Sequence, residues 1–297
     1  MHHTLPRDND RVYKWGQSTT NLGTRPYCFI YTHKHIDNWD QLFDPLKKPD
    51  IFQNQGEADA SSRTDDPSIK IIVGDDSKKV GFDFQQYFQL LGTHLLGQNI
   101  IYGPVLTNDV MLCLDLLSMT QQGLTILADQ QSDSTTVTGS NADQQFLCPL
   151  GSLVFSFKLQ KVASNLVSHI DKLVGIAIVD SISNLSIVKS KKIDIKIKFI
   201  DNSSSHDIYG NNDKFGGILM DYTQYDDQYD VNLGSGINVL TDDTLGLNKI
   251  VGGSSSIILV SREEILAGFF NSFESMYFTF AQQGIEPFKD KLSKITL

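Results

Sequence analysis

The side chains of this 297-residue chain that could do chemistry lie in four short polar segments separated by apolar ones. In the most informative segment, Lys214 follows Asp207 by seven residues and stands just before Phe215-Gly216-Gly217. Glycines allow a ligand to approach the backbone closely, and a lysine beside them can offset a developing phosphate or carboxylate charge. The alternative for this segment is a hairpin turn with a solvated lysine.

The other three segments carry weaker signals. Residues 123–131 (GLTILADQQ) predict a strand that ends near Gln130 and opens into a polar loop, which is either a ligand-closing loop or an ordinary surface loop. Gly234-Ser235-Gly236-Ile237-Asn238 lacks the third glycine and the helix of a dinucleotide fingerprint. Asn108-Asp109-Val110 marks a strand-to-helix junction, for which simple helix capping is the alternative.

The elements that must position these segments alternate between strand and helix from Phe82 onward. Apolar residues at helical spacing predict helices at 84–91, 109–119 and 163–183, and a final helix capped by Ser261 with Glu264. Strands are predicted at 99–102, 123–128, 151–157, 193–199, 217–220 and 229–233. This order predicts an α+β fold, with a mixed β-sheet and helices packed on one face.

Residues 1–80 are polar and rich in turns, and they predict an N-terminal extension of unknown role with short strands at 27–31 and 71–73. The remaining residues, 81–297, are expected to form one domain.

Composition excludes several classes of protein. The net charge is −10, which argues against general nucleic-acid binding. No apolar run reaches the roughly 18 residues that a membrane span needs, so no membrane association is expected. Cys28, Cys113 and Cys148 are odd in number and lack metal-ligand spacing. We therefore expect a reducing compartment, most simply the cytoplasm, and no metal site of the protein's own.

In order and spacing, the segments from about Phe82 to the C-terminus resemble the catalytic domain of biotin–protein ligases of the holocarboxylase synthetase style. The resemblance also rests on Leu147-Cys148-Pro149-Leu150-Gly151 and on Gln282-Gln283-Gly284-Ile285-Glu286-Pro287. It implies that biotin and Mg·ATP form biotinyl-5′-AMP, and that biotin then passes to a lysine of a biotin carboxyl carrier domain of a carboxylase. It further implies that the chain stops before the family's small C-terminal domain.

The resemblance also implies residue roles. Lys214 would contact the biotin carboxylate and the α-phosphate, and Gln130 would line the biotin pocket. Asn108 and Asp109, with Val110 beside them, occupy the place of the Ser-Thr pair that meets the ureido ring. The remaining substrate-binding positions are Asp207, Gly216, Gly234, Gly236 and Asn238.

The sequence departs from the family where phosphates would be held. The family's glycine- and arginine-rich loop should follow Gln131 directly, but residues 80–157 contain no lysine or arginine. Asp133 and Asp143 stand in that loop instead. Two hypotheses follow: a biotin–protein ligase that uses Lys214 with Lys196 and Lys198 as substitute cations, or a catalytically inactive pseudo-ligase that binds or regulates. A lipoate-type ligase is a third option.

Overall fold

The computed structural model describes residues 11–16, 27–32, 70–71, 81–103, 123–131, 148–200, 203, 205–241 and 245–297. Its strands are β1 (Arg11–Gly16), β2 (Tyr27–Thr32), β3 (Lys70–Ile71), β4 (Asn99–Gly103), β5 (Leu124–Ala128), β6 (Ser152–Ala163), β7 (Ile195–Phe199), β8 (Ser205–Gly210), β9 (Asp213–Tyr225) and β10 (Gln228–Asn238). The helices of this part of the chain are α2 (Phe84–Leu90), α4 (Ser164–Val167), α5 (Ile170–Ser183), α6 (Ser186–Lys191), α7 (Leu247–Ile250), α8 (Arg262–Gln283), the 3-10 turn η4 (Glu286–Phe288) and α9 (Lys289–Ile295).

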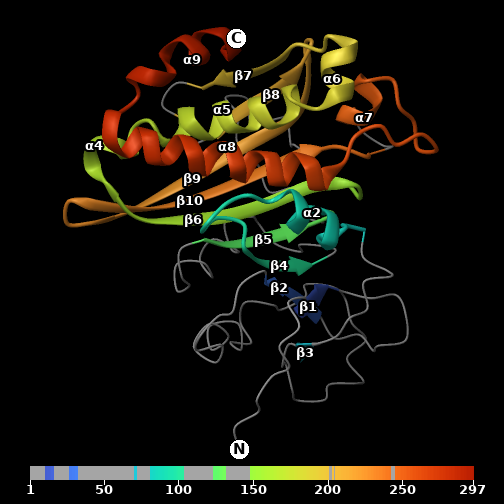
Figure 1. Ribbon diagram of the computed structural model, residues 1–297, viewed down its shortest axis with the longest axis horizontal. Helices are drawn as coiled ribbons and strands as arrows, with labels where there is room; N and C mark the ends of the chain where they lie inside the picture. The colour runs from blue at the N-terminus through green and yellow to red at the C-terminus, as the bar shows by residue number, and fades with distance from the viewer. Residues whose placement is uncertain are drawn as a thin grey trace, which may run out of the picture.

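The strands form one mixed sheet in the order β3-β2-β1-β4-β5-β6-β10-β9-β8-β7. The long helices α5 and α8 lie side by side across it, with α2 next to α8 (Figure 1). This confirms the predicted α+β class with helices on one face of a mixed sheet. β1 and β2 both pair with β4, so strands from the first 80 residues extend the same sheet. The boundary at residue 80 stays a prediction.

The core lies between the sheet and these helices, and alternation along the strands decides which side chains enter it. On β6, Phe155 and Phe157 point toward α8, where their rings lie 5.1 and 5.3 Å from those of Phe269 and Phe270, respectively. Since successive residues of a strand face opposite sides, Val154 and its even-numbered neighbours lie on the other face, which we call the open face. Three candidate site residues described below, Asp207, Lys214 and Gly236, lie on that face.

The predicted capping of α8 is confirmed, because the side chain of Ser261 accepts a hydrogen bond from the Glu264 N–H at 3.1 Å. Among the described residues, no helix is both long and apolar enough to cross a membrane.

Two local predictions were wrong. The helix expected at 163–183 is α4 and α5 with a break at Ser168 and His169, and β6 runs on to Ala163 because it pairs with Gln228 at the start of β10. Gly234-Ser235-Gly236 was expected after a strand, whereas it lies inside β10. The predicted helix at 109–119 lies outside the described residues.

Candidate functional site

An ion pair between Lys214 and Asp207 forms the charged centre of the open face. The ammonium Nζ of Lys214 lies 2.7 Å from Oδ1 of Asp207, and both side chains are mostly buried. A tight turn with Asn211 in the left-handed conformation (φ 57°) joins β8 to β9 and brings the two residues together. The Tyr209 hydroxyl donates to Oδ2 of Asp207 at 3.5 Å. Burial and the neighbouring negative charge of Asp207 raise the pKa of Tyr209.

A row of small residues leads away from this pair across the open face. Strand register sets Asp207 beside Gly217, Gly217 beside Gly236, Gly236 beside Val154, and Val154 beside Ala128. We call these five positions the glycine row. Its two glycines carry no side chain, so a ligand that reached the row would meet backbone there. In the structure Gly217, Val154 and Ala128 are buried and Gly236 is partly exposed.

The predicted glycines divide between the two faces of the sheet. Gly234 and Asn238 flank Gly236 at the two-residue spacing that puts all three on the open face, and Oδ1 of Asn238 accepts from the Ser152 hydroxyl at 2.9 Å. Gly216 is not brought to this face: a Cβ there would lie 3.0 Å from Cδ1 of the core residue Ile208. Its neighbour Gly217 holds the position in the glycine row.

Gln130 follows the end of the glycine row by two residues, since Ala128 is the last residue of β5. The chain is fixed there by a backbone hydrogen bond of 2.9 Å from the Gln131 N–H to the Cys148 carbonyl. Asn108, Asp109 and Val110 lie outside the described residues.

A buried ion pair that the sequence did not predict holds the residue before Gln130. Arg262, the first residue of α8, places Nη1 2.6 Å from Oδ1 of Asp129 and also donates to the Ser152 carbonyl at 3.0 Å and to the Gly81 carbonyl. The Tyr102 hydroxyl donates to the other oxygen of Asp129. Burial raises the pKa of Asp129, while the positive charge of Arg262 and the hydrogen bonds oppose that rise. We call Asp129 and Arg262 the loop clamp.

The sequence also did not lead us to predict a second cation of the open face, Lys158. Lys158 is 1% exposed, and its Nζ lies 2.6 Å from Oδ2 of Asp230. Register puts it beside Asn232, two residues along β10 from Gly234. The signal was available in the sequence, because Ser156 and Lys158 alternate with phenylalanines along β6.

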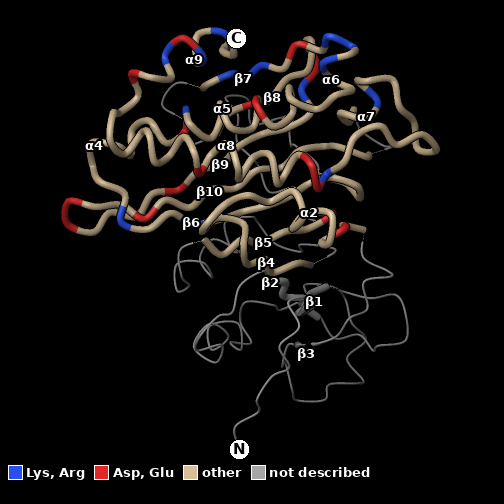
Figure 2. Tube along the Cα trace, in the orientation of Figure 1, with Lys and Arg blue, Asp and Glu red and all other residues tan. Residues whose placement is uncertain are grey.

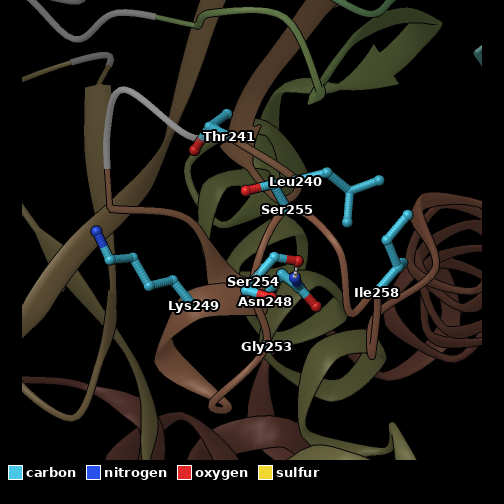
Figure 3. A pocket seen from close by; sticks show the side chains of 8 residues that line it. All are labelled: Leu240, Thr241, Asn248, Lys249, Gly253, Ser254, Ser255 and Ile258. Carbon is cyan, nitrogen blue, oxygen red and sulfur yellow. Dashed lines mark hydrogen bonds between the residues drawn. The ribbon is translucent and has the colours of Figure 1, made fainter.

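A pocket of about 520 Å³ opens just past Asn238, lined by Leu240, Thr241, Asn248, Lys249, Gly253, Ser254, Ser255 and Ile258. Figure 3 shows Asn248 at its centre and Lys249 extending away from Ile258 on the opposite side. Asn248 shapes the wall, since its amide donates to the Ser254 and Ile257 carbonyls at 3.1 Å and accepts from the Leu259 N–H at 2.7 Å. The volume of the pocket is within the range of small-molecule sites, roughly 300–1,000 Å³.

The curated proteins that match the chain are biotin–protein ligases. The chain is 28% identical over 224 residues to the chloroplastic biotin–protein ligase 1 of Arabidopsis thaliana, a match that covers 74% of this chain and 58% of the relative. It is 28% identical over 225 residues to biotin–protein ligase 2 of the same plant, with 75% and 65% covered. The human biotin–protein ligase is 25% identical over 173 residues, with 57% and 23% covered. The chain therefore spans about six tenths of the length of its two plant relatives.

Among solved structures, an Aquifex aeolicus biotin protein ligase mutant in complex with biotin has a TM-score of 0.49 at 20% identity, covering 67% of this chain and 78% of that one. The Leishmania major enzyme with biotin has a TM-score of 0.46 at 13% identity, covering 67% and 80%. No protein-family model matches the chain.

Proposed function

We propose that this chain, which is similar over about three quarters of its length to two plant biotin–protein ligases, is a biotin–protein ligase. It would form biotinyl-5′-AMP from biotin and Mg·ATP and transfer the biotinyl group to a lysine of a carboxylase carrier domain. The observation that carries the proposal is the Lys214–Asp207 pair at one end of the glycine row. The three widely spaced cysteines favour the cytoplasm as its location.

In the first step, a carboxylate oxygen of biotin attacks the α-phosphorus of ATP, and the bond to the bridging oxygen breaks to release pyrophosphate. Two anions must meet, and this repulsion is reduced by a fixed cation. Lys214 supplies that cation, and Asp207 orients its ammonium group. At an effective dielectric constant near 20, a unit charge about 4 Å away contributes around 4 kcal/mol.

The glycine row and the pocket divide the two substrates between them in this proposal. The apolar chain of biotin would lie along Gly217 and Gly236, with Gln130 at the far end of the row. The nucleoside part of ATP would enter the pocket beyond Asn238. Mg²⁺ would arrive with ATP as part of the substrate.

In the second step, the amine of the carrier lysine attacks the biotinyl carbonyl, an amide bond forms, and AMP leaves with the electron pair of the broken acyl–phosphate bond. The amine must lose a proton to react. Asp207 lies next to Lys214 and can accept that proton or pass it to solvent.

Further cations of the open face can compensate for the lysine- and arginine-free stretch. Lys198 lies beside Asp207 and Lys196 beside Tyr209 in the register of β7 with β8. Lys158 adds a buried ammonium group on β6, which is paired with Asp230. These residues support the ligase over the inactive alternative, which rests on Asp133 and Asp143 in the family's cationic loop.

Biotin-dependent exchange of pyrophosphate into ATP, followed by labelling of a carrier domain, tests the proposal. The wild-type chain should catalyse both, and Lys214→Met should lower the exchange rate about 100-fold or more. Lys161→Met is the matched control, because this exposed lysine lies at the far end of β6. No exchange by the wild-type chain, combined with tight biotin binding in calorimetry, would establish the pseudo-ligase instead. Exchange that depends on lipoate and not on biotin would establish the lipoate-type ligase.

A further inference from the structure

The lysines of the described domain gather at one edge of the sheet. Nine of the 13 lysines between residues 81 and 297 belong to α6, β7, α7 and α9 or adjoin them, namely Lys189, Lys191, Lys192, Lys196, Lys198, Lys249, Lys289, Lys291 and Lys294. Figure 2 shows these elements together along the β7 side of the molecule, with blue segments on each. We call the nine residues the β7-edge lysines. Three of the nine are paired with carboxylates, Lys196 with Asp194, Lys289 with Glu286 and Lys291 with Asp180. In a chain with a net charge of −10, the nine together still make this edge electrostatically unlike the rest of the surface.

Contacts along the chain join α9, β7 and α6 into one surface. The N–H of Leu297 donates to the Ile197 carbonyl at 3.0 Å, and Thr296 bridges to Ile197, so the end of α9 lies against the outer side of β7. The Lys196 ammonium group donates to the Lys294 carbonyl. α6 leads directly into β7, and Lys189 and Lys191 on it are exposed.

The edge also lies next to the proposed site. β7 is the last strand of the sheet, and β8, which carries Asp207, is its neighbour. Lys198 is directly opposite Asp207 in the ladder, so the two backbones are separated by about 5 Å. A macromolecule that docks on the edge can therefore extend one of its side chains to the Lys214–Asp207 pair.

We propose that the β7-edge lysines form the docking surface for an acidic face of the protein substrate, an inference that rests on the proposed ligase function. The acceptor lysine must reach an activated carboxyl group beside Lys214, which lies on β9, two strands in from β7. An acidic partner is repelled by a chain of net charge −10 except where cations concentrate. Complementary charge of this kind steers encounter and sets orientation.

The chemistry of the edge favours an acidic protein over a nucleic acid. All nine cations are lysines, and the arginine of the described domain, Arg262, is buried in the loop clamp. Arginine forks and exposed aromatic rings are the groups that read and stack bases.

Charge reversal on α6 tests the docking surface in the full-length chain. Lys191→Glu is compared with Lys161→Glu, which changes the net charge equally and lies at the far end of β6. Carrier-domain biotinylation, biotin-dependent pyrophosphate exchange and direct binding of the carrier domain are measured at low and high salt. At low salt, the edge variant should raise the KM for the carrier domain about tenfold and reduce its salt dependence, with kcat and the exchange rate unchanged.

The outcomes separate the two proposals. An equal KM in the edge and control variants, with exchange intact, overturns the docking surface and leaves the ligase standing. Absence of exchange in the wild-type chain refutes the ligase, and direct binding of the carrier domain then tests the docking surface. Weaker carrier binding by the edge variant supports the docking surface. Unchanged carrier binding by that variant, or no carrier binding by the wild-type chain, overturns it. Binding of a labelled 20-nucleotide DNA that the edge variant abolishes, with carrier binding unaffected, would assign the edge to nucleic acid.

Discussion

Replacement of Arg262 by methionine should destabilise the domain in a pH-dependent manner. The substitution keeps much of the apolar stem but leaves the Asp129 carboxylate buried without its cation, which lies 2.6 Å away in the wild-type protein. Breaking a buried ion pair from one side typically costs about 3–5 kcal/mol. Loss of the hydrogen bonds to the Ser152 and Gly81 carbonyls contributes a part of this cost that does not depend on pH.

The pH dependence follows from the direction of the Asp129 pKa. Burial already raises it in the wild-type protein, and Arg262 opposes the rise, so the variant should raise it further. A folded state that holds a proton the unfolded state has lost becomes less stable as pH rises, by at most about 1.4 kcal/mol per pH unit for one proton. The stability deficit of Arg262→Met should therefore be smaller at pH 5 than at pH 8.

Urea unfolding followed by circular dichroism at the two pH values measures this difference. Arg262→Met/Asp129→Asn is the control, because the amide keeps the shape of the carboxyl group and cannot ionise. The double variant should be more stable than Arg262→Met at pH 8 and should lose the extra pH dependence. If the deficit is the same at both pH values and the double variant gains nothing, the loop clamp is not an electrostatic unit. The same clamp positions Gln130, so Arg262→Met should also raise the KM for biotin more than it lowers kcat.

Three further perturbations test the described packing. Gly97→Ala should lower the free energy of unfolding by more than about 2 kcal/mol, since Gly97 has φ +70° and a Cβ would lie 2.4 Å from the Tyr87 hydroxyl. Gly252→Ala is the control for backbone strain in the same urea titration, because Gly252 also has a positive φ but a Cβ there would meet open space. Gly216→Ala should cost about 1–3 kcal/mol by pressing on Ile208, and equal stability to wild type would show that the core yields there. Burial raises the pKa of the Cys148 thiol to about 12, so in a background of Cys28→Ser and Cys113→Ser it should react with a thiol reagent at pH 8 only at the rate of unfolding, and rapid labelling of the folded protein would contradict its burial.

The elements that could be predicted from the sequence are those with strong local signals. The alternation of isoleucines and lysines at 193–199 predicted β7, and Ser261 with Glu264 predicted the start of α8. The end of β6 could not be predicted in this way. Ala163 continues the strand because β10 supplies a pairing partner 65 residues later in the chain, and that contact overrides the local helical pattern.

In the candidate site, too, contacts that are local in the sequence could be predicted and long-range contacts could not. Lys214 and Asp207 could be grouped because one tight hairpin joins them. The sequence could not predict whether Gly216 or Gly217 lies on the open face. An irregularity in the pairing at Ile208 and Tyr209 shifts the register of β8 with β9, and a shift of one residue turns a side chain to the other face of the sheet. The loop clamp joins Asp129 and Arg262, which are 133 positions apart, and no local sequence pattern predicts such a contact.

The placement of positive charge changes how the lysine- and arginine-free stretch should be understood. A cation needs to be near a phosphate in space, and neighbouring strands can provide it as well as the loop that follows β5. Lys158, Lys198 and Lys214 come from three different strands and share the open face. Two of them are already paired with Asp230 and Asp207, so the face offers less net positive charge than the number of its lysines suggests. In the proposed function, much of the neutralisation of the ATP triphosphate would therefore fall to its Mg²⁺. Catalytic competence thus depends on how closely these strands bring their lysines to the α-phosphate, which the composition of any single loop does not decide.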